Sequence, residues 1–315
     1  MSNTTIKAIQ AHDYGGPDVL ALEQISRPEP NTDQVLIRLK AAGVNPADWK
    51  NRSGMFKQFM PLTFPWTPGL EGSGIVEAVG ANVNTWKKGD DVYGIVNGGY
   101  AEYALASAKD LQPKPAELTF EAAASMPVGF LTAWGAVIDT ANVRADQHVL
   151  VHGAAGGTGV YAVQLAKWKG AYVIGTASEG NLDFARSLGA DEMIDYNATR
   201  FETVLKDLDV VIDTVGADLL EPSLKVIRPG GIFVTVAGRP AEDAGKAQNV
   251  RAVSAGRAST EHLKEASELI EAKIVKPVVG KIFPLAEARQ AQELSETRHG
   301  RGRIILKTEN GRSGG

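Results

Sequence analysis

The 315-residue sequence contains no cysteine. This absence excludes disulfide bonds and thiolate metal ligands, and it fits a reducing compartment, so a cytoplasmic location is expected. The chain also lacks any run approaching the roughly 20 apolar residues that a membrane span requires, and residues 1–7 lack the basic start and apolar run of an export signal. The net charge of -4 leaves no basic excess, which argues against a nucleic-acid partner.

The hydrophobic pattern divides the chain into two regions with different periodicity. A length of 315 residues suggests about two domains. Before about residue 115, short alternating segments are separated by Gly, Pro and Asn, which predicts a mostly β domain. Its expected strands are 6–9, 34–41, 74–79, 91–96 and 100–104. From about residue 120, helical patterns alternate with strands, which predicts a doubly wound parallel sheet. The strands expected there are 148–152, 171–176, 191–195, 208–213 and 231–236.

A glycine-rich turn joins one of these strands to a helix. Residues 148–152 predict a short strand, four glycines follow within residues 153–159, and residues 160–169 carry apolar positions at helical spacing. The segment 154–159 fits G-x-G-x-x-G except that Ala154 replaces the first glycine. Glycine lets the backbone approach a pyrophosphate, and the helix N-terminus offers free N–H groups to an anion. In this context the turn predicts a dinucleotide site, although glycine clusters also form ordinary turns.

Further motifs follow one another along almost the whole chain. They are Ala42-Gly-Val-Asn-Pro-Ala-Asp48, Pro68-Gly-Leu-Glu-Gly-Ser-Gly-Ile-Val76, Lys88-Gly-Asp-Asp-Val-Tyr-Gly94, Gly99-Tyr-Ala-Glu-Tyr103, Leu131-Thr-Ala-Trp134, Leu188-Gly-Ala-Asp191, Asp213-Thr-Val-Gly216, Arg228-Pro-Gly-Gly-Ile232 and Gly300-Arg-Gly-Arg-Ile-Ile-Leu306. In this order they resemble a zinc-independent medium-chain dehydrogenase/reductase of the quinone oxidoreductase-like (zeta-crystallin type) branch. The resemblance implies an α/β fold: a GroES-like β domain formed by residues 1–122 and 277–315, and a Rossmann-like domain with a doubly wound parallel sheet formed by residues 123–276. The substrate cleft is expected at their junction.

The same resemblance bears on zinc, because the alcohol-dehydrogenase branch of the superfamily uses it. Asn45 stands where that branch has its first cysteine, and Leu70 stands where it has the histidine of Gly-His-Glu, which leaves Glu71 alone. A catalytic zinc needs three protein ligands, so none is expected. The five histidines (12, 148, 152, 262 and 299) lie outside the ligand positions. His152, at a strand end, is expected to be packed or to cap a turn.

Without a metal or a nucleophile, the chemistry falls to a nicotinamide cofactor. The resemblance implies that Asn45 and Thr132 lie on the nicotinamide side, where Asn45 donates to a developing oxyanion or holds the ribose. Alternatively, Asn45 is a turn former before Pro46, and Thr132 is a helix-start residue. Asp48 is assigned a structural role, and no proton-transfer residue is assigned. The implied cofactor-binding set is Asn45, Thr132, Ala155, Gly156, Gly157, Thr158, Gly159, Ser178, Tyr196, Val215, Ala237 and Gly238.

The end of the second strand of the cofactor domain decides between NADP and NAD. An acid there binds the ribose 2′-hydroxyl of NAD, whereas this strand ends before Ser178, whose hydroxyl tolerates a phosphate. Tyr196 matches a family position that contacts the 2′-phosphate. Glu179 is the objection, since the next cation along the chain is Arg186. We therefore expect NADP, with Glu179 either favouring a helix N-terminus or, alternatively, binding the ribose of NAD.

Substrate and assembly follow from the resemblance. The expected pocket is lined by Trp49, Met55, Phe56 and Phe64, with ordinary core packing as the alternative. Such a cleft suits a quinone or an α,β-unsaturated carbonyl compound. Two alternatives stay open: an enoyl-thioester reductase, and a non-catalytic NADPH-binding protein like a lens crystallin. Residues 249–254 read as an edge strand that the family pairs across a twofold axis, so a homodimer is expected unless Arg251 and the neighbouring loop already guard that edge. The tail 310–315 is expected to be disordered.

Overall fold

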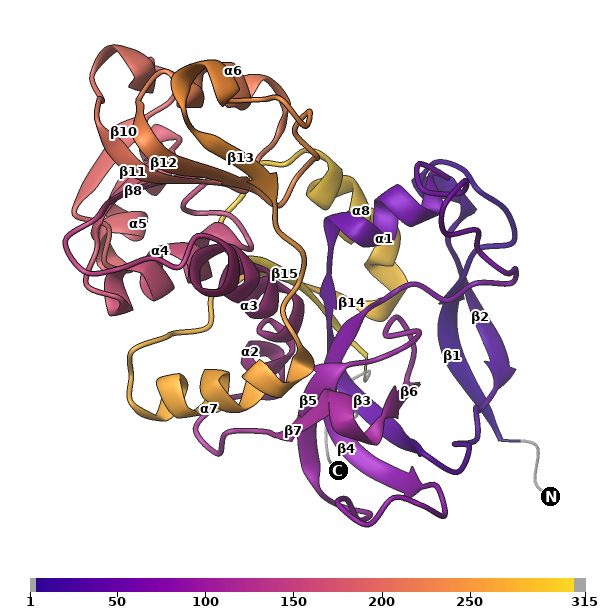
Figure 1. The fold of residues 1–315 in the computed structure, drawn as a ribbon. Coiled ribbons are helices and arrows are strands. Elements are labelled where there is room, and N and C mark those ends of the chain that lie inside the picture. Colours follow the sequence, from indigo (N-terminus) through magenta and orange to yellow (C-terminus); the bar gives the residue numbers. More distant parts are fainter. Residues whose placement is uncertain (1–3, 309–315) are drawn as a thin grey trace.

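The computed structural model describes residues 4–308, which form two lobes, each built on its own sheet (Figure 1). The tail that was expected to be disordered, residues 310–315, lies outside the described residues. One sheet has six strands and the other seven, and a separate antiparallel pair joins β1 (Thr5–Gln10) to β2 (Ala21–Ser26).

The seven-stranded sheet brings together the two ends of the chain. Its strands are β3 (Gln34–Val44), β4 (Glu71–Val79), β5 (Asp91–Ile95), β6 (Tyr103–Ser107), β7 (Leu111–Pro113), β14 (Val279–Pro284) and β15 (Arg303–Lys307). They follow the order β14-β15-β3-β4-β5-β7, with β6 also paired to β3. β15 runs antiparallel to β3, with Ile305 opposite Gly43. The alternating residues Val35, Ile37 and Leu39 of β3 are buried in one cluster, as period-two patterning predicts.

The six-stranded sheet is entirely parallel, in the order β10-β9-β8-β11-β12-β13. Its strands are β8 (His148–His152), β9 (Tyr172–Ala177), β10 (Glu192–Asp195), β11 (Leu208–Asp213), β12 (Ile227–Thr235) and β13 (Arg251–Ser254). β8 and β11 have the bounds expected from the sequence, and β9 and β10 differ from them by one residue. β12 begins four residues earlier than expected, because residues 227–231 continue the strand ahead of the segment that pairs with β13.

Helices cover both faces of this parallel sheet. The described helices are α1 (Pro46–Arg52), α2 (Phe120–Ala124), α3 (Pro127–Trp134), α4 (Gly159–Trp168), α5 (Leu182–Ser187), α6 (Leu220–Leu224), α7 (Leu263–Glu271) and α8 (Ala288–Glu296), with the π-helical η3 (Gly135–Thr140). Single 3₁₀ turns are η1 (Pro17–Val19), η2 (Ala108–Asp110), η4 (Glu179–Asn181), η5 (Phe201–Thr203), η6 (Ala217–Leu219), η7 (Lys246–Gln248), η8 (Thr260–His262) and η9 (Leu285–Glu287). The expected domain boundary at 122/123 falls inside α2, which packs on β3 and β4.

The alternation of buried residues explains why the sheet is covered twice. Val149 and Val151 of β8 belong to the cluster that includes α3 and α4, whereas Leu150 belongs to a second cluster with Leu224 of α6 and Phe201. Near-continuous apolar strands are typical of sheets buried on both faces. This arrangement confirms the expected doubly wound parallel sheet.

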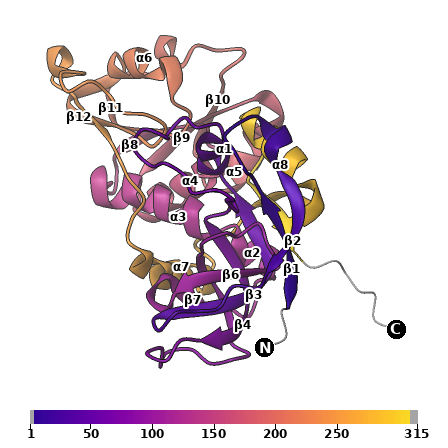
Figure 2. The same cartoon turned by 90° about the vertical axis from the view of Figure 1, so that its right-hand side faces the viewer.

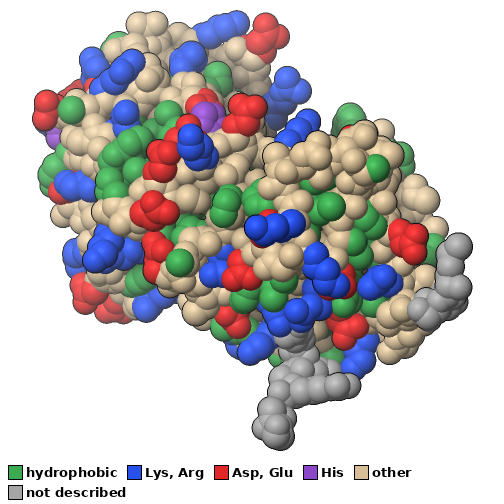
Figure 3. All heavy atoms as spheres, turned by 90° about the horizontal axis from the view of Figure 1, so that it is seen from below, with side chains coloured by type: hydrophobic (Ala, Val, Ile, Leu, Met, Phe, Trp, Pro, Cys, Tyr) green, Lys and Arg blue, Asp and Glu red, His purple; other side chains and the backbone are tan. Residues whose placement is uncertain are grey.

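Two further features concern the seven-stranded lobe and the surface. α1 and α8 lie side by side in both ribbon views (Figures 1 and 2). On the face drawn in Figure 3, basic and acidic side chains are interspersed over the surface. Among residues 4–308, the helices are all too short or too polar to traverse a bilayer.

Candidate active site

The carboxyl ends of the parallel strands bring most of the predicted cofactor residues to one edge. The glycine turn follows β8, Ser178 follows β9, Tyr196 follows β10, and Val215 follows β11. Ala237 and Gly238 come after β12, beside the β11 end, since a Cβ on Gly216 would lie 3.0 Å from that of Ala237. Ligands of open α/β sheets bind at this edge.

The glycine turn is held by its own backbone. Ala154 N–H donates to the Thr176 carbonyl (3.0 Å) and Gly156 N–H to the Gly153 carbonyl (2.9 Å). A Cβ on Gly159 would lie 2.0 Å from the Gly153 oxygen, so glycine is required where the turn enters α4. A Cβ on Gly156 would meet only that same oxygen, at 3.3 Å, and otherwise open space. The turn therefore leaves a free concavity at Gly156, as a cradle for an anion would need.

Ser178 and Tyr196 are neighbours at the adjoining strand ends. Asp195 pairs with Ala177 in the sheet, and Tyr196 N–H donates to the Ala177 carbonyl (3.2 Å). Tyr196 is 49% exposed. Ser178 occupies the N-cap position of η4, but its Oγ accepts from the Asn181 amide (3.0 Å) rather than from a backbone N–H. Glu179 is exposed beside it.

Asn45 lies in a buried cluster that joins both ends of the chain. The Arg303 guanidinium, from β15, donates to Asn45 Oδ1 (2.6 Å) and to Glu71 Oε1. Asn45 Nδ2 donates to Glu71 Oε1 (2.8 Å), and the N–H of Val128 donates to Glu71 Oε2 (2.7 Å). Asn45, Glu71 and Arg303 are 1%, 0% and 4% exposed. Every hydrogen-bonding direction is fixed, because Arg only donates and the carboxylate only accepts.

This cluster touches the glycine turn. A Cβ on Gly157 would lie 3.1 Å from Cδ and from Nη1 of Arg303, and the N–H of Gly302 donates to the Ala155 carbonyl (2.8 Å). Arg303 Nε is buried and has no hydrogen-bond partner. An orphaned cationic donor beside an open glycine cradle is the donor set that a pyrophosphate accepts. The residues present therefore fit a dinucleotide.

Asp48 supports the start of α1. Its Oδ2 accepts from the Asn45 N–H (2.8 Å) and from the Tyr100 hydroxyl (3.0 Å). Burial raises the pKa of the Asp48 carboxyl from 3.8 to about 7, although these two donors and Arg303 oppose the increase. Asn45 is the N-cap of α1 and Pro46 its first residue, so the segment that the sequence offered as a turn, in the alternative interpretation of Asn45, is the beginning of a helix.

The positions that hold zinc in the alcohol-dehydrogenase branch are occupied differently here. Asn45 and Glu71 are bound to Arg303, as described above. Within residues 4–308, no group of three His, Cys, Asp or Glu side chains is placed to hold a metal. His152 packs between Thr176 (3.2 Å) and Ser223 (3.1 Å), edge-on to Phe201. Burial lowers the pKa of His152 to about 4, so it is neutral near pH 7.

The predicted nicotinamide and substrate residues are more scattered. Thr132 lies half-buried inside α3, as its sixth residue rather than at its start. Trp49 is 8% exposed on α1, and its Nε1 is buried without a partner. Phe64 packs edge-on to Tyr14, with ring centroids 5.0 Å apart. Phe56 is half-buried, and Met55, 57% exposed, does not line an enclosed wall.

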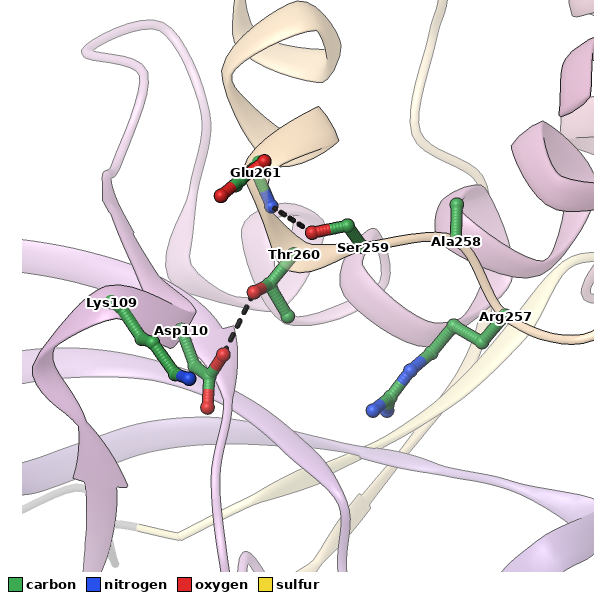
Figure 4. Close-up of a pocket in the computed structure, with 7 residues that line it drawn as sticks. All are labelled: Lys109, Asp110, Arg257, Ala258, Ser259, Thr260 and Glu261. Atoms are coloured by element: carbon green, nitrogen blue, oxygen red, sulfur yellow. Dashed lines mark hydrogen bonds between the residues drawn. The ribbon is translucent and has the colours of Figure 1, made fainter.

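A polar cavity of about 310 Å³ separates the two lobes at η2 and η8. Figure 4 shows the acidic Asp110 from one lobe facing Thr260 from the other, whose hydroxyl donates to Asp110 Oδ1 (2.7 Å). Nearby, the Tyr93 hydroxyl donates to the Leu263 carbonyl (2.9 Å). The lining is mostly charged or polar and contains none of the predicted aromatic residues. This cavity lies at a hydrogen-bonded contact between the lobes and does not suit an apolar substrate.

Sequence reasoning missed Arg303 as a member of the site and recognised Glu71 only as an unsupported zinc ligand. The available signal was a charged residue at the start of the apolar strand Arg303-Ile-Ile-Leu306. A buried arginine nearly always has a partner, and the motif Gly-Leu-Glu-Gly offered a buried acid.

Comparison with known proteins agrees with these features. The family model "Alcohol dehydrogenase GroES-like domain" matches residues 31–116, and "Zinc-binding dehydrogenase" matches residues 188–306. The chain is 36% identical to the quinone oxidoreductase of Mus musculus over 320 residues, covering 95% of this chain and 96% of that protein. It is 37% identical to the NADPH-dependent alkenal/one oxidoreductase, chloroplastic, of Arabidopsis thaliana, covering 96% of this chain and 79% of that protein.

A solved structure extends the similarity to the fold. The quinone oxidoreductase of Coxiella burnetii superposes with a TM-score of 0.88 at 35% identity, covering 97% of this chain and 100% of the other. Together with the GroES-like match, this likeness confirms the expected GroES-like and Rossmann-like combination. The chain therefore belongs to the quinone oxidoreductase-like branch of the medium-chain dehydrogenase/reductase family, and it is an oxidoreductase.

Proposed function

We propose that this protein is a zinc-independent, NADPH-dependent oxidoreductase that transfers hydride to a quinone or an α,β-unsaturated carbonyl compound. The observation that carries the proposal is the open glycine cradle at Gly156, with the buried cation of Arg303 beside it. The names of the relatives from Mus musculus and Arabidopsis thaliana support the substrate class and the cofactor.

The residues of this chain bind and orient the reactants. Reduced nicotinamide supplies the hydride when it is bound. The backbone of residues 155–159 receives the pyrophosphate, and Arg303 adds positive charge at that point. Asn45 is 1% exposed, so it serves as a positioning residue that fixes the orientation of Arg303 and Glu71. Thr132, whose hydroxyl makes no hydrogen bond among residues 4–308, is the contact that we assign to the nicotinamide side.

The remaining assignments follow the strand ends. Ser178 and Tyr196 flank the 2′-phosphate, and Val215, Ala237 and Gly238 border the nicotinamide half of the dinucleotide. Trp49, Phe56 and Phe64 line the substrate side, next to α1. We assign residues 1–122 and 277–315 to the substrate domain and residues 123–276 to the cofactor domain.

A second copy of the chain is the proposed partner. β13 is the end strand of the six-stranded sheet, with its free edge at residues 251–254. The Arg251 side chain donates to the Thr140 carbonyl (2.9 Å). The backbone of β13 pairs with no strand on its free side among the described residues. A free edge favours pairing, so we propose a twofold dimer through β13 and a cytoplasmic enzyme that needs neither a membrane nor nucleic acid. Light scattering at micromolar concentration tests the dimer, and a monomer there would refute it.

The decisive experiment measures NADPH oxidation with 9,10-phenanthrenequinone, beside an enone and an enoyl-thioester. Turnover with the quinone or the enone supports the proposal. NADPH binding without turnover of any of the three would instead indicate a non-catalytic binding protein, and exclusive turnover of the thioester would indicate an enoyl-thioester reductase. Gly156→Val is the control, because its side chain fills the open cradle and should abolish NADPH binding in a folded protein. Prolonged chelation should leave turnover unchanged; a loss that zinc restores would overturn the zinc-independent assignment.

A further inference from the structure

The segment between α8 and β15 carries a second arginine to the cofactor edge of the Rossmann-like sheet. Arg301 Nε donates to the Asn181 side-chain oxygen (3.1 Å), and its Nη2 donates to the Gly180 carbonyl (3.0 Å). Its guanidinium carbon lies 4.4 Å from the centroid of the Phe184 ring. Three contacts from η4 and α5 therefore hold this exposed cation at the end of β9.

These contacts connect Arg301 to Ser178. Asn181 accepts from Arg301 with its side-chain oxygen and donates from its side-chain nitrogen to Ser178 Oγ (3.0 Å). A single side-chain amide thus separates the guanidinium from the hydroxyl that we assign to the 2′-phosphate. Two N–H groups of Arg301 are used in its bonds to η4, and the others remain available to an anion.

The charged residue that directly follows Ser178 is an acid. Glu179 directly follows Ser178, is exposed, and forms no ion pair within the described part of the chain, so by itself it would repel a phosphate. Arg186 is paired with Asp183 (2.8 Å), and Lys167 is paired with Asp191 (2.6 Å). Arg301 has no carboxylate partner among residues 4–308, which leaves its charge to offset Glu179.

The approach of this segment to the sheet is fixed at its other end. Gly302 has φ +61° and donates its N–H to the Ala155 carbonyl (2.8 Å), and Arg303 follows in the buried cluster. The segment therefore crosses from the glycine turn to the end of β9 with one arginine at each place. Because both ends are held, Arg301 is not a freely moving surface side chain.

We propose that Arg301 is the residue that gives the site its preference for NADP, by supplying from the C-terminal segment the cation that the β9 end lacks. This inference rests on the proposed NADPH-dependent function and extends it to a specificity-determining residue outside the Rossmann-like strands. In NAD the same position carries a neutral hydroxyl, so Arg301 contributes to binding of NADPH and little to binding of NADH.

The test measures the dissociation constants of NADPH and NADH by fluorescence titration of the purified protein, at low and at moderate ionic strength. Arg301→Gln should weaken NADPH binding about tenfold, the size expected for one charge-assisted hydrogen bond, and should change NADH binding by less than about twofold. Adding Glu179→Gln to Arg301→Gln should recover part of the loss, since the uncompensated acid is then removed. The matched control is Arg186→Gln, an exposed arginine on α5 that is paired with Asp183 and should change neither constant.

The outcomes separate the two proposals. If the wild type binds NADPH no more tightly than NADH, the proposed NADP dependence fails, and Arg301 fails with it. If the wild type prefers NADPH but Arg301→Gln leaves that preference intact, the Arg301 assignment alone is wrong. Equal weakening of both cofactors would also overturn it, because it would assign Arg301 a structural role in holding η4. A loss for NADPH alone that diminishes as salt is added supports the assignment.

Discussion

Replacing Arg303 by methionine should destabilise the protein strongly, because it leaves the Glu71 carboxylate buried without its cation. Glu71 is fully buried and would keep only two donors, Asn45 Nδ2 (2.8 Å) and Val128 N–H (2.7 Å). Removing one partner of a buried ion pair costs about 3–5 kcal/mol. The two remaining donors place the expected cost near 3 kcal/mol, and the midpoint of thermal unfolding should fall by about 5–10 °C.

A double-mutant cycle isolates the pair. Glu71→Gln combined with Arg303→Met removes both charges and should be more stable than Arg303→Met alone, with a coupling energy of about 2 kcal/mol. Thermal unfolding near neutral pH, followed by tryptophan fluorescence, measures all four proteins. A midpoint for Arg303→Met within about 2 °C of the wild type, or strictly additive effects, would refute the view that Arg303 and Glu71 depend on one another.

Three further perturbations follow from the geometry. Gly159→Ala should destabilise the turn and weaken NADPH binding, since its Cβ would lie 2.0 Å from the Gly153 oxygen. Equal thermal midpoints for Gly159→Ala and the wild type would contradict this. Burial raises the pKa of Asp48 from 3.8 to about 7, so the stability that its protonated form contributes is lost as pH rises across that interval. Asp48→Asn should therefore flatten the plot of thermal midpoint against pH between these values, and an unchanged slope would count against the shift. Ser178→Asp should place a negative charge at the proposed 2′-phosphate site and reverse the preference from NADPH to NADH through affinity rather than turnover number, as titration and steady-state kinetics can determine.

Local patterns predicted the parallel sheet well. The strands at 148–152 and 208–213 have the expected bounds because each is a short apolar run closed by Gly, Asp or Thr, and both of its faces are buried by helices. The glycine turn was predictable for the same reason, since its strand–turn–helix context is contained in about twenty consecutive residues. The parallel strands and the glycine turn could thus be predicted because each depends on residues that are close together in the sequence.

The buried cluster of Asn45, Glu71 and Arg303 could not be predicted in this way. Asn45 is the N-cap of α1, Glu71 begins β4 and Arg303 begins β15. They meet only because β15, near the end of the chain, pairs with β3. Hydrophobic periodicity carries no information about contacts between residues so far apart in the sequence. The start of α1 was missed for a different reason: Asn before Pro fits both a turn and a helix N-cap, and the Asp48 carboxylate, which accepts from the Asn45 N–H, decides for the helix.

The position of Arg303 has a consequence for how the two lobes are coupled. Its guanidinium lies between Glu71, on the seven-stranded sheet, and Gly157, on the glycine turn after β8. An anion received at the turn attracts the same cation that neutralises Glu71, so binding changes the electrostatic balance of the Asn45 cluster without any movement of the sheets. Because Asp48 accepts from the Asn45 backbone and also experiences Glu71 and Arg303, its proton affinity should respond to occupation of the turn. The buried network thus couples the two lobes electrostatically, because the same guanidinium contacts Glu71 in one lobe and lies beside the glycine turn of the other.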